Sequence, residues 1–297
     1  MAILRTIGRI LVRVLAGIGA ATVALVLYVL FMIPYVREAP EPLPDSVVLK
    51  VNIDGEIRDG RSSPSILLGD PGPTMREYVL GLEAAAEDDR VKGVAAYLGA
   101  ASLSIAEAQE LRDAIARVRS AGKFAHVYSD DLGGIGGGTA RYYTASAFDE
   151  IWLQPSGGVG LIGLSMEMPF VHGTLQELEV ETRFGSRHEY KSAVEMFTRT
   201  GLSAPARENL QAMLDSLFTQ IVEGIAAHRG LDADAVRDLV DGGPYLSGEA
   251  VENGLVDRLG YFDEYIEAAR ELAGDDAEDV SFRRYLCLLY TSDAADE

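Results

Sequence analysis

The stretch Val47-Val48-Leu49-Lys50-Val51-Asn52-Ile53, which the turn pair Asp54-Gly55 follows, predicts a β-strand. Three further apolar runs of strand length come after it along the chain, at 91–98, 124–128 and 151–153. Windows with helical periodicity separate these runs. Alternation of this kind predicts an α/β fold in layers around a largely parallel sheet.

The helical windows carry their own start and stop signals. Ser104 opens one of them as an N-cap, Glu107 completes a capping box, and apolar residues recur at helical spacing up to Gly122. Thr74 is expected to cap another helix. The helices expected in this way cover 74–88, 104–122, 203–228, 232–240 and 262–273. Because no internal repeat and no long linker interrupts 47–273, we expect one domain there.

The 297 residues contain 26 Lys and Arg against 46 Asp and Glu, a net charge of −20, and 48% of them are hydrophobic. This composition is typical of a globular protein with a sizeable core, and it excludes an intrinsically disordered chain. The acidity argues against nucleic acid partners, because binding to them depends on Lys and Arg that neutralise phosphates. The only cysteine is Cys287, so no internal disulfide can form.

An uncharged segment of 23 residues, 14–36, follows the arginines Arg5, Arg9 and Arg13. As a helix that rises ~1.5 Å per residue it would be about 34 Å long, enough to cross a hydrocarbon core of about 30 Å. A cleavable signal peptide is the competing interpretation, but its apolar region is typically about 7–15 residues long. We therefore expect an uncleaved transmembrane anchor at 14–36 and a stiff, proline-rich spacer at 37–46. The positive-inside rule places 1–13 in the cytoplasm and the main domain outside it.

Two glycine-rich segments lie in the middle of the chain. The segment 158–163 matches the GxGxxG pattern of dinucleotide-binding folds, but the residues at 165–168 alternate like a strand and no helix is expected to follow directly. We therefore expect no nucleotide cofactor. The segment 133–138 is expected to form a loop that runs into a helix near Thr139. The four histidines are scattered without a metal-binding spacing, and we expect no metal site.

Lys191 stands in the run Tyr190-Lys191-Ser192-Ala193-Val194-Glu195-Met196-Phe197. Taken alone, such a lysine is most often a solvated surface residue. A lysine can act as general base toward a serine only where burial lowers its pKa toward neutrality, since the charged form cannot accept a proton. The apolar neighbours are compatible with burial, and spacing does not decide between the two roles.

The run 187–197, which contains this lysine, and the segment 202–208 after it resemble the lysine segment of the signal peptide peptidase A family, also called protease IV. Upstream, 140–147 and 151–157 are similar to the same family. Downstream, 248–257, which ends in Gly254-Leu255-Val256-Asp257, matches it as well. The likeness runs in the right order over about 47–272.

This resemblance implies a Clp-protease/crotonase-like layered α/β fold behind one N-terminal transmembrane helix. It also implies a serine endopeptidase with a Ser/Lys dyad that degrades cleaved signal peptides at the outer face of the bacterial inner membrane. Lys191 then falls on the general base of the family. The family further implies ring-like homo-oligomers and no cofactor.

The sequence departs from the short form of the family at the nucleophile. There the serine stands in a Ser-Gly-Gly-Tyr-Tyr run, whereas here Tyr142-Tyr143 follow Thr139-Ala140-Arg141. A long form carries the lysine in a first domain and the serine in a second, and this chain resembles the first of these domains. Two alternatives stay open: a self-contained site in which Thr139, a more hindered nucleophile, attacks, and a non-catalytic membrane-anchored scaffold of the same fold. An acyl-thioester enzyme of the crotonase group would share the fold but leave the anchor unexplained.

The C-terminal residues give two further expectations. The segment 274–286 is expected to open a second domain that is cut off, so this chain alone is expected to lack activity. Residues 287–297 back-translate to an adapter used in preparing sequencing libraries, read through in frame, and we expect them to be an artefact.

Overall fold

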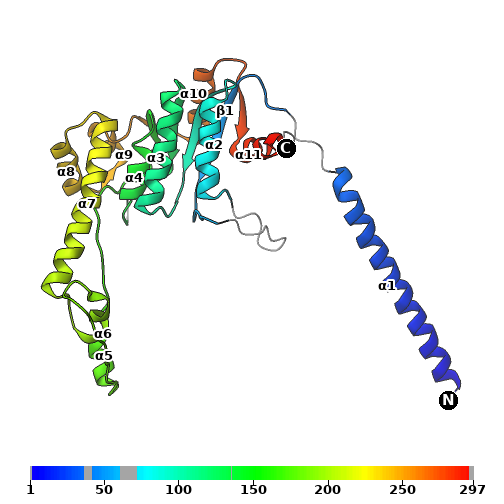
Figure 1. Cartoon of the computed structure of the whole chain (residues 1–297). Coiled ribbons are helices and arrows are strands. Elements are labelled where there is room, and N and C mark those ends of the chain that lie inside the picture. Colours follow the sequence, from blue (N-terminus) through cyan, green and yellow to red (C-terminus); the bar gives the residue numbers. More distant parts are fainter. Residues whose placement is uncertain (1, 37–41, 61–71, 135, 294–297) are drawn as a thin grey trace. The chain divides into compact units, whose positions relative to one another are not determined.

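The computed structural model describes residues 2–36, 42–60, 72–134 and 136–293. The chain divides into two compact units, 1–42 and 43–297. The first consists mainly of helix α1, Ala2–Val36 (Figure 1). The helix expected at 14–36 is thus present, while most of the spacer expected at 37–46 lies outside the described residues. In the part of the chain that the structure describes, no helix combines the length and the apolar character that crossing a bilayer requires.

The second unit holds every other element. Its strands are β1 Val47–Ile53, β2 Val91–Leu98, β3 Phe124–Ser129, β4 Glu150–Leu153, β5 Gly158–Val159, β6 Tyr245–Leu246, β7 Arg258–Leu259 and β8 Glu278–Ser281. Its helices are α2 Met75–Glu87, α3 Ile105–Ser120, α4 Thr139–Ala145, α5 His172–Glu177, η1 Ser192–Val194, α6 Glu195–Thr198, α7 Ala204–Arg229, α8 Ala233–Gly242, α9 Ser247–Glu252, α10 Phe262–Ala273 and α11 Phe282–Asp293.

Six strands form one sheet in the order β7-β4-β3-β2-β1-β8, and every neighbouring pair is parallel. The predicted α/β fold with a parallel sheet is therefore confirmed. β1 and β2 have the bounds expected from the sequence, because strands covered on both faces are continuous apolar runs that pattern alone can locate. β5 and β6 form a separate antiparallel pair beside this sheet.

The capping box expected at Ser104 and the N-cap expected at Thr74 are confirmed. The Ser104 Oγ accepts the backbone N–H of Glu107, and the Glu107 carboxylate accepts the N–H of Ser104 at 2.7 Å. Thr74 and Glu77 exchange the same pair of bonds at the start of α2. Each cap satisfies backbone groups that the first helical turn leaves without partners, a contribution of about 1 kcal/mol to helix stability.

Helices cover the two faces of the sheet unequally. α2 and α3 lie side by side on one face (Figure 1) and bury the larger core between themselves and the strands. α10 packs on the opposite face through Tyr265, Ile266 and Ala269. The Tyr265 hydroxyl lies 3.0 Å from the carbonyl of Ala96 and 2.8 Å from that of His126, so it fixes α10 to β2 and β3.

The segment expected to open a second domain lies in this same unit. β8 pairs in parallel with β1 as an edge strand, and its Val280 is buried. α11 then packs Phe282 into the core, where its ring stacks on Tyr78 at 5.5 Å between ring centroids. Gly81 makes room for that ring, since a Cβ at this position would lie 2.5 Å from it. Residues 274–286 thus complete the sheet and core in this structure, and α11 continues through the residues expected to be an artefact as far as Asp293.

Candidate functional site

The glycine-rich loop after β3 is organised by one carboxylate. Asp131 Oδ2 accepts the N–H of Gly133 at 3.2 Å, while its Oδ1 accepts the N–H of Gly134 at 3.1 Å and that of Gly158 at 2.9 Å. Asp131 therefore shapes the loop and ties it to β5 at the same time.

Glycine is required here because the two backbones approach closely. A Cβ at Gly138 would lie 1.8 Å from the carbonyl oxygen of Leu132, and one at Gly160 would lie 1.8 Å from that of Gly133. The GxGxxG pattern at 158–163 thus serves close packing of the loop against β5. The strand-like alternation expected at 165–168 is not confirmed, since these residues form no strand. None of them is buried, so no neighbouring strand covers them.

Thr139 is the first residue of α4 and is buried, with 6% of its surface exposed. Its Oγ1 donates to the carbonyl of Gly163 at 2.8 Å and accepts the N–H of Ile162 at 3.3 Å. Both hydrogen-bonding directions of the hydroxyl are therefore used on the backbone of the next segment. In this arrangement the Thr139 hydroxyl holds the start of α4 against the backbone of 162–163. The hydroxyl is not exposed, as a nucleophile would have to be.

Lys191 lies on an arm that we define as residues 162–205, which includes α5, η1 and α6. No residue of this arm is buried in the described structure. Figure 1 shows α5 and α6 beyond the N-terminal end of α7, away from the sheet. Lys191 is exposed, and no hydrogen bond or ion pair of its side chain is present among the described residues. The structure thus does not bring Lys191 and Thr139 together.

The arm is held by its own polar and aromatic contacts. Glu195 accepts the backbone N–H of Ser203 at 2.9 Å and its hydroxyl at 2.5 Å, which closes the loop that leads into α7. These two bonds lower the pKa of the Glu195 carboxyl. Phe184 stacks on Phe197 at 5.3 Å between ring centroids, and Tyr190 donates to Glu208 on α7 at 3.1 Å. Lys191 is therefore presented on a folded segment.

A family model, Peptidase family S49, matches residues 121–275 of this chain. This segment is more than half of the chain, and it contains β3, the glycine-rich loop, Lys191 and α10. The chain belongs to peptidase family S49. The resemblance found in the sequence is thereby confirmed at the level of the family.

Curated relatives of this S49 peptidase agree with the family match. The chloroplastic serine protease SPPA of Arabidopsis thaliana is 25% identical over 80% of this chain and 34% of its own length. Protease 4 of Haemophilus influenzae is 29% identical over 63% of this chain and 32% of its own length. An Enterococcus faecium protein named as a signal peptide peptidase SppA is 25% identical over 75% of this chain and 63% of its own. The chain thus spans about a third of the length of the first two relatives.

Solved structures also resemble the S49 chain. An enoyl-CoA hydratase/isomerase family protein from Silicibacter pomeroyi superposes with a TM-score of 0.39 and 12% identity, over 79% of this chain and 82% of that one. The α/β fold is confirmed. Membership in the narrower Clp-protease/crotonase-like group stays a prediction.

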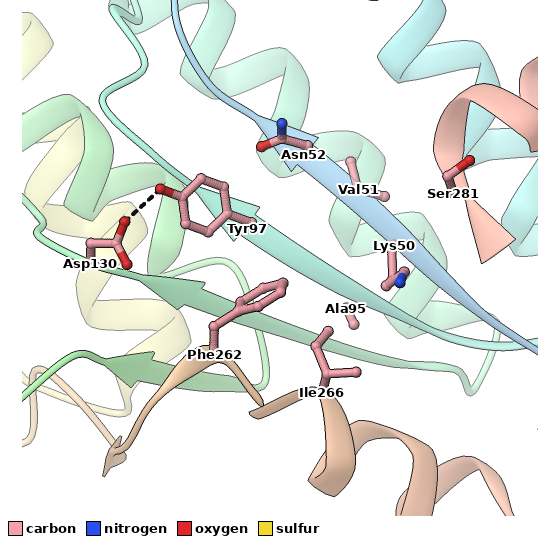
Figure 2. Close-up of a pocket in the computed structure, with 9 residues that line it drawn as sticks. All are labelled: Lys50, Val51, Asn52, Ala95, Tyr97, Asp130, Phe262, Ile266 and Ser281. Atoms are coloured by element: carbon pink, nitrogen blue, oxygen red, sulfur yellow. Dashed lines mark hydrogen bonds between the residues drawn. The ribbon is translucent and has the colours of Figure 1, made fainter. Parts of the chain in front are cut away.

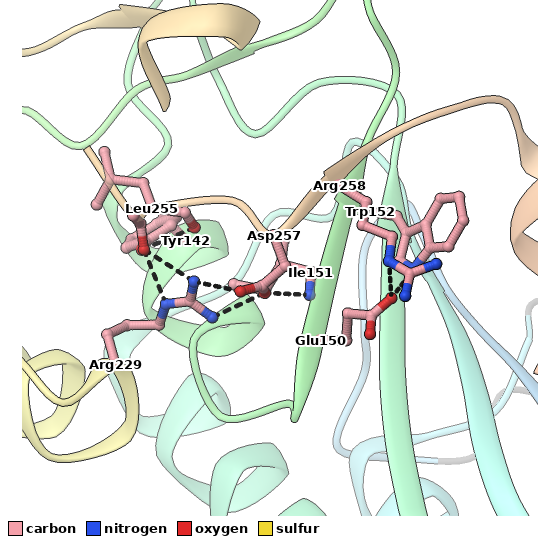
Figure 3. Close-up of polar contacts among 9 residues, drawn as sticks. Tyr142, Glu150, Ile151, Trp152, Arg229, Leu255, Asp257 and Arg258 are labelled. Carbon is pink, nitrogen blue, oxygen red and sulfur yellow. Dashed lines mark hydrogen bonds and ion pairs between the residues drawn. The ribbon is translucent and has the colours of Figure 1, made fainter. Parts of the chain in front are cut away.

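The S49 domain holds the C-terminal end of α7 through a hydrogen-bond network that the sequence analysis missed (Figure 3). The arm lies at the other end of this helix. Arg229 at the end of α7 makes two bonds to Asp257, at 2.8 and 2.9 Å, and also donates to the carbonyl of Gly254. Asp257 in turn accepts the N–H of Ile151 on β4 at 2.7 Å. The Tyr142 hydroxyl donates to the carbonyl of Leu255 at 3.0 Å, and burial raises the pKa of this tyrosine. The run Gly254-Leu255-Val256-Asp257 is the feature of the sequence that could have indicated this network.

A second buried group, on α3 and outside the family match, is Arg112, which is 5% exposed. Its guanidinium donates to the carbonyl of Tyr143, to the Ser146 hydroxyl at 2.7 Å and to the carbonyl of Gly224 at 2.9 Å. It also lies 4.0 Å from the Tyr143 ring centroid. Burial, with the nearby guanidinium, lowers the pKa of His228, whose Nδ1 is 3.1 Å from Arg112. Arg112 thus joins α3, α4 and α7.

Proposed function

We propose that this S49 chain is the lysine-bearing part of a membrane-anchored serine endopeptidase that degrades cleaved signal peptides. The observation that carries the proposal is the family match over 121–275, which includes the Lys191 segment. The name of the Enterococcus faecium relative supports the choice of signal peptides as substrates. We include a Clp-protease/crotonase-like fold in the proposal, since the parallel sheet is compatible with it.

In the proposed reaction, the neutral amine of Lys191 accepts the proton of a serine hydroxyl, and the serine oxygen attacks the carbonyl carbon of the peptide bond. The protonated lysine then returns the proton to the leaving amine, and water releases the acyl group in a second step. The short form of the family has its serine in the run that corresponds to 139–143. Here Thr139 begins that run and its hydroxyl is hydrogen-bonded to the backbone, so we place the serine on another part of the protein. No cofactor or metal takes part in this proposal.

A general-base lysine must be desolvated, and Lys191 is exposed in this chain. The proposal therefore requires another surface to cover the arm. Large apolar side chains are exposed along it, namely Ile162, Met166, Leu178, Val180, Phe184 and Tyr190. Exposed apolar groups gathered in this way are typical of protein–protein contacts. We propose that a second copy of the protein covers the arm within a homo-oligomer; sedimentation as a monomer at all concentrations would contradict this.

Anchoring to the bacterial inner membrane through 14–36, with 1–13 in the cytoplasm, is also part of the proposal. It is supported by the 23 uncharged residues of this segment and by the three arginines that precede it. After expression in bacteria, the chain is expected to stay in the membrane pellet during extraction with alkaline carbonate. A chain that starts at Leu43 is the matched control and is expected in the supernatant. Release of the full chain by carbonate would contradict the anchor.

The function itself is tested by incubating a form of the protein that carries the serine with a synthetic apolar peptide of signal-peptide length. Mass spectrometry is expected to show internal cleavage of this peptide, and slower cleavage of an acidic, soluble peptide of equal length. If neither peptide is cleaved, the non-catalytic scaffold of the same fold becomes the better account.

A further inference from the structure

A pocket of about 430 Å³ opens on the α10 side of the sheet (Figure 2). It is lined by strand residues and by the start of α10, chiefly Lys50, Asn52, Tyr97, Asp130, Phe262 and Ile266. None of these residues belongs to the arm or to the glycine-rich loop. The proposed peptidase chemistry therefore leaves this pocket without a role.

The pocket lies toward the carboxyl ends of three parallel strands. In the register of the sheet, Asn52 on β1 stands opposite Tyr97 on β2, and Tyr97 stands opposite Tyr128 on β3. Asp130 follows directly after β3 ends. Open parallel sheets bind ligands at the carboxyl ends of their strands, where loops and strand ends bring side chains together.

Three aromatic rings form a corner at this end of the pocket. Tyr97 and Tyr128 stack with 6.3 Å between ring centroids, and Phe262 meets Tyr97 edge-on at 6.0 Å and Tyr128 at 5.4 Å. Tyr128 is buried, whereas Phe262 is 45% exposed and Tyr97 is half-buried. The corner thus presents aromatic surface to whatever enters the pocket, and such surface attracts cations.

Carboxylates surround the same corner. The Tyr97 hydroxyl donates to Asp130 Oδ2 at 2.6 Å (Figure 2), and Asp130 is exposed. This hydrogen bond is the main reason that the pKa of Tyr97 is raised, so the hydroxyl keeps its proton. Asp54 also raises the pKa of Tyr97, and Asp263 adds to the effect of burial, which is the main cause that raises the pKa of Tyr128. Aromatic faces and negative charge together favour a cationic group.

The one cation in the pocket lining is turned away from this corner. Lys50 is paired with Asp279 at 3.1 Å, and Asp279 stands opposite Val48, two residues toward the amino end of β1. In the sheet register Lys50 is level with His126, four residues before Asp130, which is about 13 Å along the strands at ~3.3 Å per residue. Lys50 therefore leaves the negative charge at Asp130 unneutralised.

We propose that this corner binds the ammonium or guanidinium group of a Lys or Arg side chain in a peptide, with Asp130 as the ionic partner and Tyr97 and Phe262 as the aromatic walls. Only the choice of a peptide as carrier of the cation rests on the proposed function. This proposal is tested by the binding of a peptide and the peptidase proposal by the cleavage of one. Either proposal can therefore fail while the other holds.

The test is calorimetric titration of the full chain, in detergent at low ionic strength, with a pentapeptide that has one central lysine between glycines and blocked ends. The matched peptide carries norleucine, which keeps the alkyl chain and lacks the charge. The lysine peptide is expected to bind at least five times more tightly than the norleucine peptide, and to weaken as salt is added. Equal binding of the two peptides, or no binding of either, would overturn the proposal.

Three variants locate the site. Asp130→Asn removes the charge with little change of shape and is expected to weaken the lysine peptide at least fivefold. Phe262→Leu keeps an apolar side chain without the ring and is expected to weaken the lysine peptide about threefold while leaving the norleucine peptide unaffected. Asp238→Asn makes the same charge change on α8, at an exposed residue outside the pocket lining, and is expected to alter binding less than twofold. If Asp130→Asn binds the lysine peptide as wild type does, Asp130 is not the partner and the proposal is wrong.

Discussion

Replacing Lys191 by alanine, in a form of the protein that carries the serine, is expected to lower kcat for peptide hydrolysis by about 10²–10⁴-fold, the usual contribution of a general base. Without the amine, nothing accepts the proton of the serine hydroxyl, and the hydroxyl is a weak nucleophile while it keeps that proton. Lys191 is exposed here and its side chain has no hydrogen-bond or ion-pair partner among the described residues, so its loss is not expected to unfold the arm. The measurement is steady-state hydrolysis of a fluorogenic apolar peptide.

Lys191→Arg is expected to fail as completely as the alanine variant, because a guanidinium stays protonated and cannot act as a base. The matched control is Lys92→Ala, at an exposed lysine of β2 outside the family match, whose Nζ donates to the carbonyl of Asp89. This control is expected to keep full activity. Activity in Lys191→Ala equal to that of the control would remove Lys191 from the mechanism.

Replacing Arg112 by methionine is expected to destabilise the domain by about 2–4 kcal/mol. The variant leaves the carbonyls of Tyr143 and Gly224 and the Ser146 hydroxyl without their charged donor, and each hydrogen bond to a charged group contributes about 1.5–3 kcal/mol. Part of this loss is offset, because methionine does not carry the cost of burying a charge. For a domain of this size each kcal/mol lowers Tm by roughly 2–4 °C, so calorimetry is expected to show a clear downward shift.

Arg237→Met is the control for this prediction. Arg237 lies on α8 in an exposed pair with Asp234 at 3.0 Å, and such pairs contribute at most about 1 kcal/mol. Its Tm is expected to stay close to that of the wild type. An Arg112→Met protein as stable as the control would show that the contacts of the buried guanidinium only balance its desolvation.

Local signals were sufficient to predict most of the sheet and the helices around it. The bounds of β1 and β2, the capping box at Ser104 and the N-cap at Thr74 came from the sequence because apolar runs, caps and glycines act over a few residues. The long helix expected at 203–228 is α7, and α10 has the expected bounds. Each of these elements buries apolar residues in one of the two cores, so its hydrophobic periodicity reports its structure directly.

Features that depend on distant residues could not be predicted. The place of β8 beside β1 is a pairing between residues more than 200 positions apart, so 274–286 was expected to open a second domain. Arg112 is buried on α3 with Leu111 and Ile115, and its charge is tolerated there because carbonyls of α4 and α7, distant in the sequence, accept its hydrogen bonds. The arm has no buried residue, so no core periodicity marks its structure or the surroundings of Lys191.

The most direct test of the account is the rate at which a serine-reactive fluorophosphonate labels a form of the protein that carries the serine, compared between its wild type and Lys191→Ala. The probe reports an activated serine without requiring a known substrate. The account predicts covalent labelling of one serine in the wild type and labelling slower by at least a hundredfold in the variant. Equal labelling rates in the two proteins, or no labelling of the wild type, would contradict the assignment of a serine–lysine peptidase.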